Sequence, residues 1–127
     1  MGASPIAHGV DLVEVRTFSG LFEGDAAIHL SRYFTPGELV SIGIDSRSAD
    51  RMSGRFAIKE AVLKALGTGW GDSIGFKDIE IVTSEIGAPS VVLHRRLHAI
   101  ATELGITRWL VSSAHAGGFV MASVIGV

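Results

Sequence analysis

Two acidic residues and one lysine stand within otherwise apolar segments of the chain. Asp11 interrupts residues 6–13, whose small and β-branched residues predict a strand. Glu60 and Lys64 are four residues apart in a segment with a helical pattern. Carboxylates from two separate elements could together hold a hard cation such as Mg²⁺, which prefers oxygen ligands. A neighbouring lysine would then suit a phosphate group, so these three residues predict a cation and phosphate site.

Each of the three residues also has a structural interpretation. Asp11 could be a hydrogen-bonded residue at a strand end or bulge beside Gly9. Glu60 and Lys64 could form an ordinary solvated helix pair, which contributes only about 0.3–0.5 kcal/mol. The apolar neighbours of this pair argue against a solvated position, whereas for Asp11 the local sequence leaves both interpretations open.

The segment 52–66 is the clearest helix of the sequence, and Gly67-Thr68-Gly69 marks its end. At 100° per residue, apolar side chains occupy both of its faces: Ile58, Ala61, Val62 and Ala65 on one, and Phe56 and Leu63 beside Glu60 and Lys64 on the other. A helix that is apolar nearly all round is usually buried. The predicted cation site is therefore expected on a buried helix.

Histidines offer two further candidates. His115 comes at the expected end of a strand, just before Ala116-Gly117-Gly118, where its imidazole could reach an anionic ligand. A lone histidine is, however, more often structural. His94 and His98 have the spacing of helical metal ligands, but the zinc-protease pattern requires a glutamate where Arg95 stands. We interpret this pair as part of a solvated helix face.

Turn and capping signals divide the rest of the chain into short elements. Thr35-Pro36-Gly37-Glu38 is a capping box that begins a helix ending near Ile42, and two short helical pieces broken at Gly24 precede it within 14–33. Strands are expected at 76–82, 90–94, 108–114 and 119–125, and a helix at 95–104 that Gly105 ends. Gly117-Gly118 predicts a hairpin between the last two strands. The expected fold class is α+β, with an antiparallel sheet packed against the long helix.

Composition excludes several classes of function. The chain has 127 residues and is expected to form a single domain over 1–127. A net charge of −2 with scattered basic residues does not favour nucleic acid as a partner, and no apolar run approaches the roughly 20 residues that span a membrane. Without cysteine or a signal-like N-terminus, a cytoplasmic location is expected. Apolar residues make up 47% of the chain, so we expect an oligomer that covers part of this surface.

Several motifs together resemble those of a known family. The longest is GRFAIKEAVLKALGTG at 54–69, and around it stand GVDLVEVR at 9–16, Phe34-Thr35 with Glu38-Leu39, DIEI at 78–81, Gly87-Ala88-Pro89 and the segment 112–115. In this order, and over almost the whole chain, they are similar to the holo-acyl-carrier-protein synthases, the small class of phosphopantetheinyl transferases.

The resemblance implies a fold, an assembly and an activity. Each subunit would be half of a larger pseudo-twofold transferase, assembled as a homotrimer with coenzyme A at each subunit interface. With Mg²⁺, the enzyme would transfer 4′-phosphopantetheine from coenzyme A to a serine of an acyl carrier protein, leaving 3′,5′-ADP. Asp11 and Glu60 would be the Mg²⁺ ligands, Lys64 would bind the diphosphate, and His115 would reach the 3′-phosphate across the interface.

Some roles stay open within this resemblance. Glu60, or a water held between Glu60 and Asp11, would accept the serine proton, and the sequence does not choose between them. Arg55 and Lys59 are weaker candidates for phosphate contacts.

The chain also departs from the family pattern. Ala114 and Ala116 flank His115 where relatives usually carry polar or acidic residues. Arg16 is followed by apolar and acidic residues, namely Phe18, Leu21, Phe22, Glu23 and Asp25. We therefore expect either more apolar docking or a less acidic carrier. The hypothesis that follows is a partner that is a carrier domain within a large fatty-acid synthase rather than a free acyl carrier protein. Two other functions are weighed: a non-catalytic oligomeric module that binds coenzyme A, and an unrelated Mg²⁺-dependent phosphohydrolase.

Overall fold

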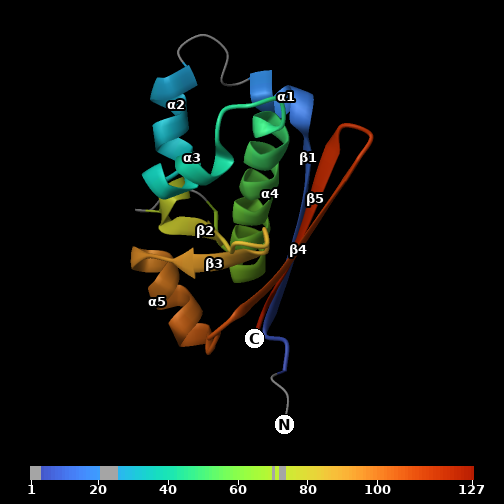
Figure 1. Cartoon of the computed structure of the whole chain (residues 1–127). Coiled ribbons are helices and arrows are strands. Elements are labelled where there is room, and N and C mark those ends of the chain that lie inside the picture. Colours follow the sequence, from blue (N-terminus) through green and yellow to red (C-terminus); the bar gives the residue numbers. More distant parts are fainter. Residues whose placement is uncertain (1–3, 21–25, 70, 72–73) are drawn as a thin grey trace.

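The computed structural model describes residues 4–20, 26–69, 71 and 74–127, and Figure 1 shows them arranged around one long helix. This helix packs against a three-stranded antiparallel sheet. The helix is α4 (Ser48–Leu66), and the strand order is β1 (Ala7–Glu14), β5 (Phe119–Gly126) and β4 (Trp109–Ala116). The predicted α+β class with antiparallel pairing is confirmed, as is the hairpin between the last two strands.

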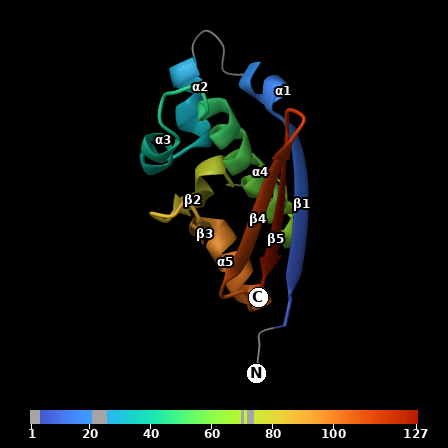
Figure 2. The same ribbon diagram turned by 45° about the vertical axis from the view of Figure 1, so that its right-hand side comes forward.

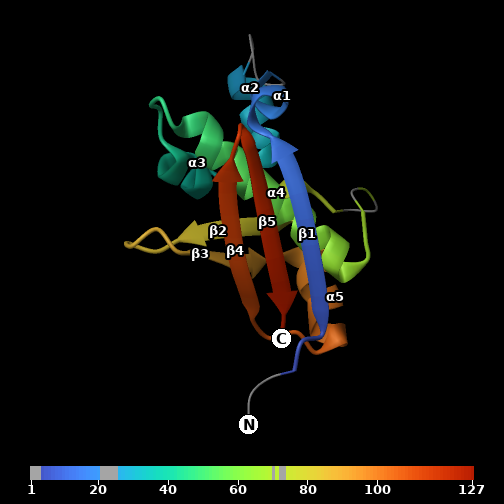
Figure 3. The same ribbon diagram turned by 90° about the vertical axis from the view of Figure 1, so that its right-hand side faces the viewer.

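The three-stranded sheet has one covered and one uncovered face. Side chains alternate along β1, so that Gly9, Asp11 and Val13 point toward α4 while Val10 and Leu12 point away. Figure 3 looks onto the outer face, which no helix of the described chain covers. Part of the core lies between the inner face and α4, where the buried residues include Ala57, Ala61, Val62, Val120, Ala122 and Val124. The same cluster continues beyond α4 through Phe34, Ile42, Ile79 and Leu97.

α4 is longer at its start than the sequence predicts. It begins at Ser48 rather than at residue 52. Hydrogen bonds order this polar turn, because Ser48 Oγ donates to the Gly43 carbonyl (2.9 Å) and accepts from the Asp45 amide (2.8 Å). A hydropathy pattern does not reveal such bonds. The end of the helix is as predicted, since Gly67 adopts the left-handed conformation with φ 71°.

The smaller helices and a second sheet lie mainly on the other side of α4, as the two views in Figures 1 and 2 agree. They are α2 (Ala26–Tyr33), α3 (Pro36–Ile42), α5 (Arg95–Leu104) and the hairpin of β2 (Ile79–Thr83) with β3 (Pro89–Leu93). The short helix α1 (Val15–Gly20) instead follows directly on β1, at the end of the three-stranded sheet. The break predicted at Gly24 lies outside the described residues. None of the described helices is long and apolar enough to cross a bilayer.

Two local predictions have different outcomes. The capping box of α3 is confirmed, because Thr35 Oγ1 accepts from the Glu38 amide at 3.1 Å and the Glu38 carboxylate accepts from the Thr35 amide at 2.8 Å. The strand expected at 76–82 is wrong in its first part, where Phe76–Asp78 forms a 3-10 turn. The Asp78 carboxylate orders that turn by accepting from the Gly75 amide at 2.9 Å, so a local contact replaces sheet pairing.

Candidate functional site

The structure brings Asp11 and Lys64 into contact where β1 meets α4. Lys64 Nζ lies 2.8 Å from Asp11 Oδ1 and donates a second hydrogen bond to the Val10 carbonyl at 3.2 Å. Asp11 and Glu60 line the same hollow of about 360 Å³ beside the rim of the sheet. We call Asp11, Glu60 and Lys64 the carboxylate half-site. Asp11, which the sequence placed in a strand, and Glu60 and Lys64, which it placed in one helix, therefore converge.

The carboxylate half-site has the donor set that a hard cation requires. The Asp11 side chain is 14% exposed and that of Lys64 is 56% exposed, so the acid is recessed behind the ammonium. Within the described residues, no three or more His, Cys, Asp or Glu side chains gather into a metal cage. Mg²⁺ commonly takes one or two carboxylates and completes its coordination with water and substrate phosphates. Asp11 and Glu60, with Glu14 at the same hollow, fit that pattern when the ligand itself carries phosphate.

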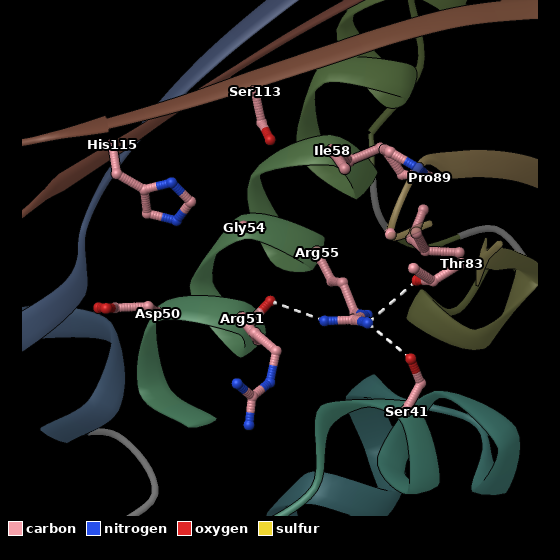
Figure 4. A pocket seen from close by; sticks show the side chains of 12 residues that line it. Ser41, Asp50, Arg51, Gly54, Arg55, Ile58, Thr83, Pro89, Ser113 and His115 are labelled. Atoms are coloured by element: carbon pink, nitrogen blue, oxygen red, sulfur yellow. Dashed lines mark hydrogen bonds between the residues drawn. The ribbon is translucent and has the colours of Figure 1, made fainter. Parts of the chain in front are cut away.

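A second hollow, of about 300 Å³, lies between α4 and β4 and contains Arg55 and His115 (Figure 4). We call these two residues the basic half-site. β4 extends to Ala116, so His115 lies near the end of the strand, as predicted, but within it rather than in the loop that was expected to present it. Its Nε2 would be 4.0 Å from a Cβ built on Gly54 of α4, which places the imidazole directly over that helix. The sheet, not a loop, therefore fixes the direction of His115.

Arg55 is a buried cation without a matching anion. It is 8% exposed, and its guanidinium donates to Ser41 Oγ (2.7 Å), Thr83 Oγ1 (3.1 Å) and the Arg51 carbonyl (3.3 Å). Its buried Nε has no hydrogen-bond partner, and none of the described carboxylates forms an ion pair with it. Burial lowers the pKa of Arg55, and the more distant charge of Glu38 opposes that shift. Such a cation is suited to an anionic ligand, because an unpaired buried charge is costly.

Sequence reasoning missed the residues that hold Arg55. Ser41 and Thr83 come from α3 and β2, and no spacing rule links either position to α4. Arg51 also lines this hollow and donates to the Asp45 carboxylate at 2.7 Å, which keeps the pKa of Asp45 below its usual range. Arg51 stands four residues before Arg55, so the two side chains share one side of a helix. This spacing is a signal from which Arg51 could have been predicted to line the same hollow.

The two half-sites lie toward opposite edges of the three-stranded sheet, as Figure 3 shows for β1 and β4. Asp11 is on β1 and His115 on β4, with β5 between them. Two strand spacings amount to roughly 10 Å, and no described residue lines both hollows. Within one chain, the half-sites therefore do not form a single pocket.

Lys59 lies at neither half-site, and its prediction as a phosphate contact needs correction. Its side chain is fully buried, and Nζ donates to Glu38 Oε1 (2.9 Å) and to the carbonyls of Tyr33 (2.7 Å) and Phe76 (3.0 Å). Glu38 also accepts from the Ile81 amide at 3.0 Å. Three acceptors use all the donors of an ammonium group, so Lys59 joins α3, α4 and β2 instead of binding a ligand. Burial lowers the pKa of Lys59, and Glu38 opposes the shift.

The histidine pair near α5 is solvated, as predicted, but it is not a helix pair. α5 begins at Arg95, so His94 lies just before the helix. His94 Nε2 is 3.0 Å from Glu80 Oε1 on β2, and both His94 and His98 are exposed. Neither residue belongs to a half-site.

Comparison with known proteins gives a consistent result. Residues 7–122 match the family model described as the 4'-phosphopantetheinyl transferase superfamily. A holo-[acyl-carrier-protein] synthase from Geobacter sp. (strain M21) is 36% identical over 92% of this chain and 94% of its own length.

Solved structures agree with the sequence relatives. The holo-[acyl-carrier-protein] synthase of Neisseria meningitidis superposes with a TM-score of 0.84 at 27% identity, covering 98% of this chain and 99% of that one. The Helicobacter pylori enzyme, in a complex with coenzyme A, superposes with a TM-score of 0.80 at 30% identity, covering 94% and 99%. The similarity extends over nearly the full length in both cases.

Proposed function

The chain belongs to the 4′-phosphopantetheinyl transferase superfamily and, within it, to the holo-[acyl-carrier-protein] synthases, and from this premise we propose its reaction and the role of each half-site. It transfers the 4′-phosphopantetheine group of coenzyme A to a serine of an apo-acyl carrier protein, which gives the holo carrier and 3′,5′-ADP. The observation that carries this conclusion is the full-length similarity to a synthase whose structure contains coenzyme A.

In this proposal Asp11 and Glu60 hold Mg²⁺. Support comes from their shared hollow and from the oxygen donors that they present from two separate elements. Bound there, the cation would offset negative charge on the diphosphate of coenzyme A. Lys64 lies beside Asp11 at the more exposed edge, and its ammonium adds positive charge for the same diphosphate.

The transfer itself exchanges the phosphoanhydride bond of the coenzyme A diphosphate for a phosphoester bond to the carrier serine. The serine oxygen of the carrier forms a bond to the β-phosphorus, and the bond from that phosphorus to the bridging oxygen breaks. The bridging oxygen leaves with 3′,5′-ADP. Glu60, or a water held between Glu60 and Asp11, accepts the serine proton. Asp11 and Glu60 are thus proposed to serve as cation ligands, and Glu60 also to serve in proton transfer.

We assign the basic half-site to the 3′-phosphate of coenzyme A. Arg55 supports this role because its buried guanidinium has an unpaired Nε and no carboxylate partner among the described residues. His115 lines the same hollow (Figure 4). Because the half-sites lie toward opposite edges of one sheet, we place the two of them on adjacent copies, with coenzyme A spanning the contact.

A homotrimer closes this head-to-tail arrangement into a ring. The outer face of the sheet in Figure 3 supports the assembly, because it carries apolar residues that are 40–63% exposed, namely Val10, Leu12, Leu110, Phe119 and Met121. An apolar sheet face of this kind is usually covered in a stable oligomer. A mass in solution of three chains, measured by light scattering, would support the ring, and a stable monomer would contradict it.

The carrier partner is an acyl carrier protein, and we retain a carrier domain of a fatty-acid synthase as a proposal. Phe18 is not available for apolar docking of the carrier, because it is 4% exposed and packs on Phe56 with ring centroids 4.5 Å apart. Leu21, Phe22, Glu23 and Asp25 lie outside the described residues. Comparable transfer rates to a free carrier and to a synthase-embedded carrier would contradict a preference for the embedded form.

The intact mass of a carrier after incubation with the chain, coenzyme A and Mg²⁺ tests the proposed function. The expected gain is about 340 Da on the carrier, the mass of one phosphopantetheine arm covalently attached, with little or no gain for Glu60→Gln. Coenzyme A binding without any gain on either type of carrier would favour the non-catalytic module. Release of phosphate or pantetheine without a carrier would indicate the phosphohydrolase. Cell fractionation tests the cytoplasmic location, which is part of the same proposal.

A further inference from the structure

We propose that Gly9 is a positioning residue for the carboxylate half-site, because the absence of a side chain there lets β1 lie directly on α4 and holds Asp11 beside Lys64 and Glu60. The inference rests on the proposed function, since it concerns the same cation site. It assigns a role to a residue that touches neither the cation nor the substrate.

The contact at Gly9 is between two backbones. A Cβ built on Gly9 would lie 1.9 Å from the Ala61 carbonyl oxygen and 2.9 Å from both the Ala61 carbonyl carbon and the Ala65 amide nitrogen. Real Cβ atoms essentially never approach another heavy atom to less than 3.0 Å. Gly9 has no positive φ, so space rather than backbone conformation requires glycine. Any side chain at this position would force β1 away from α4.

This contact is adjacent to the site in both elements. Along β1, Gly9 and Asp11 are two residues apart and point to the same face of the sheet. Along α4, Ala61 directly follows Glu60 and Ala65 directly follows Lys64. The backbone that Gly9 touches therefore belongs to the same turns that carry the two helical residues of the half-site.

The required displacement is large for a binding site. Ordinary van der Waals contact of a Cβ begins near 3.4 Å, whereas the Ala61 oxygen would be at 1.9 Å, so β1 would have to retreat by more than about 1 Å. A misplacement of about 1 Å can cost about 10²-fold in rate. The distance between the Asp11 and Glu60 carboxylates across their shared hollow would then change.

A second glycine provides a matched control. Gly126 also points inward, from β5, and pairs with Ala7, the first residue of β1 and four residues from Asp11. A Cβ there would meet the side chain of Ile106 rather than backbone, with Cδ1 at 2.9 Å and Cγ1 and Cγ2 both at 3.2 Å. Gly126→Ala should therefore disturb the same sheet and cost stability without moving Asp11.

The test compares the two glycine variants in the full chain. Mn²⁺ binding is measured by electron paramagnetic resonance without carrier, Mg²⁺ dependence by the carrier mass gain, and 3′,5′-ADP binding by calorimetry.

Gly9→Ala should weaken Mn²⁺ binding and raise the Mg²⁺ concentration needed for half-maximal transfer by about 10–100-fold, as loss of an orienting contact at a metal site does. Binding of 3′,5′-ADP should change much less, because the basic half-site does not use β1 and its α4 residue, Arg55, precedes the segment that Gly9 contacts. For Gly126→Ala, only the melting temperature should fall.

Two more variants separate positioning from general destabilisation. Ala65→Val widens the same contact from α4, and should shift Mn²⁺ binding in the same direction even if Gly9→Ala does not fold. Asp11→Glu adds one methylene, so it should impair the wild-type chain but partly restore Mn²⁺ binding to a folded Gly9→Ala chain.

The inference is overturned if Gly9→Ala, or Ala65→Val where the former does not fold, keeps wild-type Mn²⁺ binding. It is equally overturned if Gly126→Ala shifts Mn²⁺ binding as much as Gly9→Ala does. Absence of group transfer by the wild-type chain would instead refute the proposed reaction, a result distinct from either of these. A wild-type chain that binds no Mn²⁺ and needs no divalent cation would remove the cation site and this inference together.

Discussion

The two half-sites differ in how many elements build them. The carboxylate half-site needs only β1 and α4, and its residues sit on the closest contact between those two elements. The basic half-site needs α3, α4, β2 and β4, because Arg55 is held by Ser41 and Thr83 and shares its hollow with His115. A site on one rigid contact tolerates little displacement, whereas a site built from four elements depends on the whole fold. The first half-site should therefore determine the chemistry, and the second the affinity for coenzyme A.

The largest expected effect is the recovery of activity when two inactive variants are mixed. Glu60→Gln damages only the carboxylate half-site, and the double variant Arg55→Met/His115→Ala damages only the basic one. If each active site combines half-sites of adjacent copies, unfolding and refolding the two together should restore about one quarter of wild-type transfer, as random mixing in a closed ring gives. The measurement is the carrier mass gain at a coenzyme A concentration below the wild-type KM.

The control for mixing is each variant refolded alone, which should stay inactive. Recovery would require that one intact carboxylate half-site meets one intact basic half-site from another copy. If no mixture recovers while the wild type refolds fully, both half-sites of a working site belong to the same chain, and the head-to-tail ring is wrong.

The next largest effect is on stability. It concerns Lys59, which is buried against Glu38 and is not the phosphate contact that the sequence predicted. Lys59→Met leaves the buried Glu38 carboxylate without its cation, and loss of one partner of a buried ion pair typically costs about 3–5 kcal/mol of unfolding free energy. Urea unfolding measures the loss. KM for coenzyme A in the folded fraction should not change. A raised KM at unchanged stability would restore Lys59 to the phosphate site.

The pH dependence of stability gives a second check on Lys59. Burial lowers its folded pKa below the ordinary 10.5, so between the folded pKa and 10.5 the unfolded chain binds more protons than the folded chain. Stability from this group therefore rises with pH across that window and is lost as pH falls through the folded pKa. Lys59→Met should lack this rise, and Lys77→Met, at an exposed position, should keep most of it, because the charge of Lys77 makes only the smallest contribution to the lowered pKa of Lys59.

The comparison of the two half-sites also explains which of their residues could be predicted from the sequence. Asp11, Glu60 and Lys64 stand out because a charged residue in an apolar segment violates the local pattern, and one strand–helix contact is enough to join them. Ser41 and Thr83 are small polar residues at exposed or half-buried positions, so nothing local marks them. Lys59 misled the prediction, because its family motif is intact but only the fold shows the three acceptors that surround it.

The helix and strand boundaries follow a related rule. The hairpin at Gly117-Gly118 and the end of α5 at Gly105 were predictable, because glycine at positive φ is a local requirement. The early start of α4 and the 3-10 turn at Phe76–Asp78 were not, since side-chain hydrogen bonds order both. A position where the backbone requires glycine can be recognised in the sequence. Hydrogen bonds of polar side chains cannot, because their partners are brought together only by the fold.

A smaller effect is expected at Arg55. Arg55→Met keeps the buried volume and removes the charge, so a charge-assisted contact of about 1.5–3 kcal/mol to the ligand is lost. KM for coenzyme A should rise roughly 10–100-fold with a much smaller change in kcat. Arg51→Met is the matched control, because Arg51 is already paired with Asp45, and it should change KM by less. Equal effects of the two variants would show that the hollow acts through its summed charge rather than through Arg55.

The smallest effect separates the 3′-phosphate from the rest of coenzyme A. His115 is exposed and is placed by the strand, so His115→Ala should remove about 1 kcal/mol of binding, roughly 5-fold in KM. With 3′-dephospho-coenzyme A as substrate, the wild type and His115→Ala should have the same KM, because the contact has no phosphate to meet. His94→Ala, which lies outside both half-sites, should leave both substrates unaffected. If His115→Ala raised KM equally for the two substrates, the imidazole would contact another part of coenzyme A. The basic half-site would then hold the ligand through Arg55 alone.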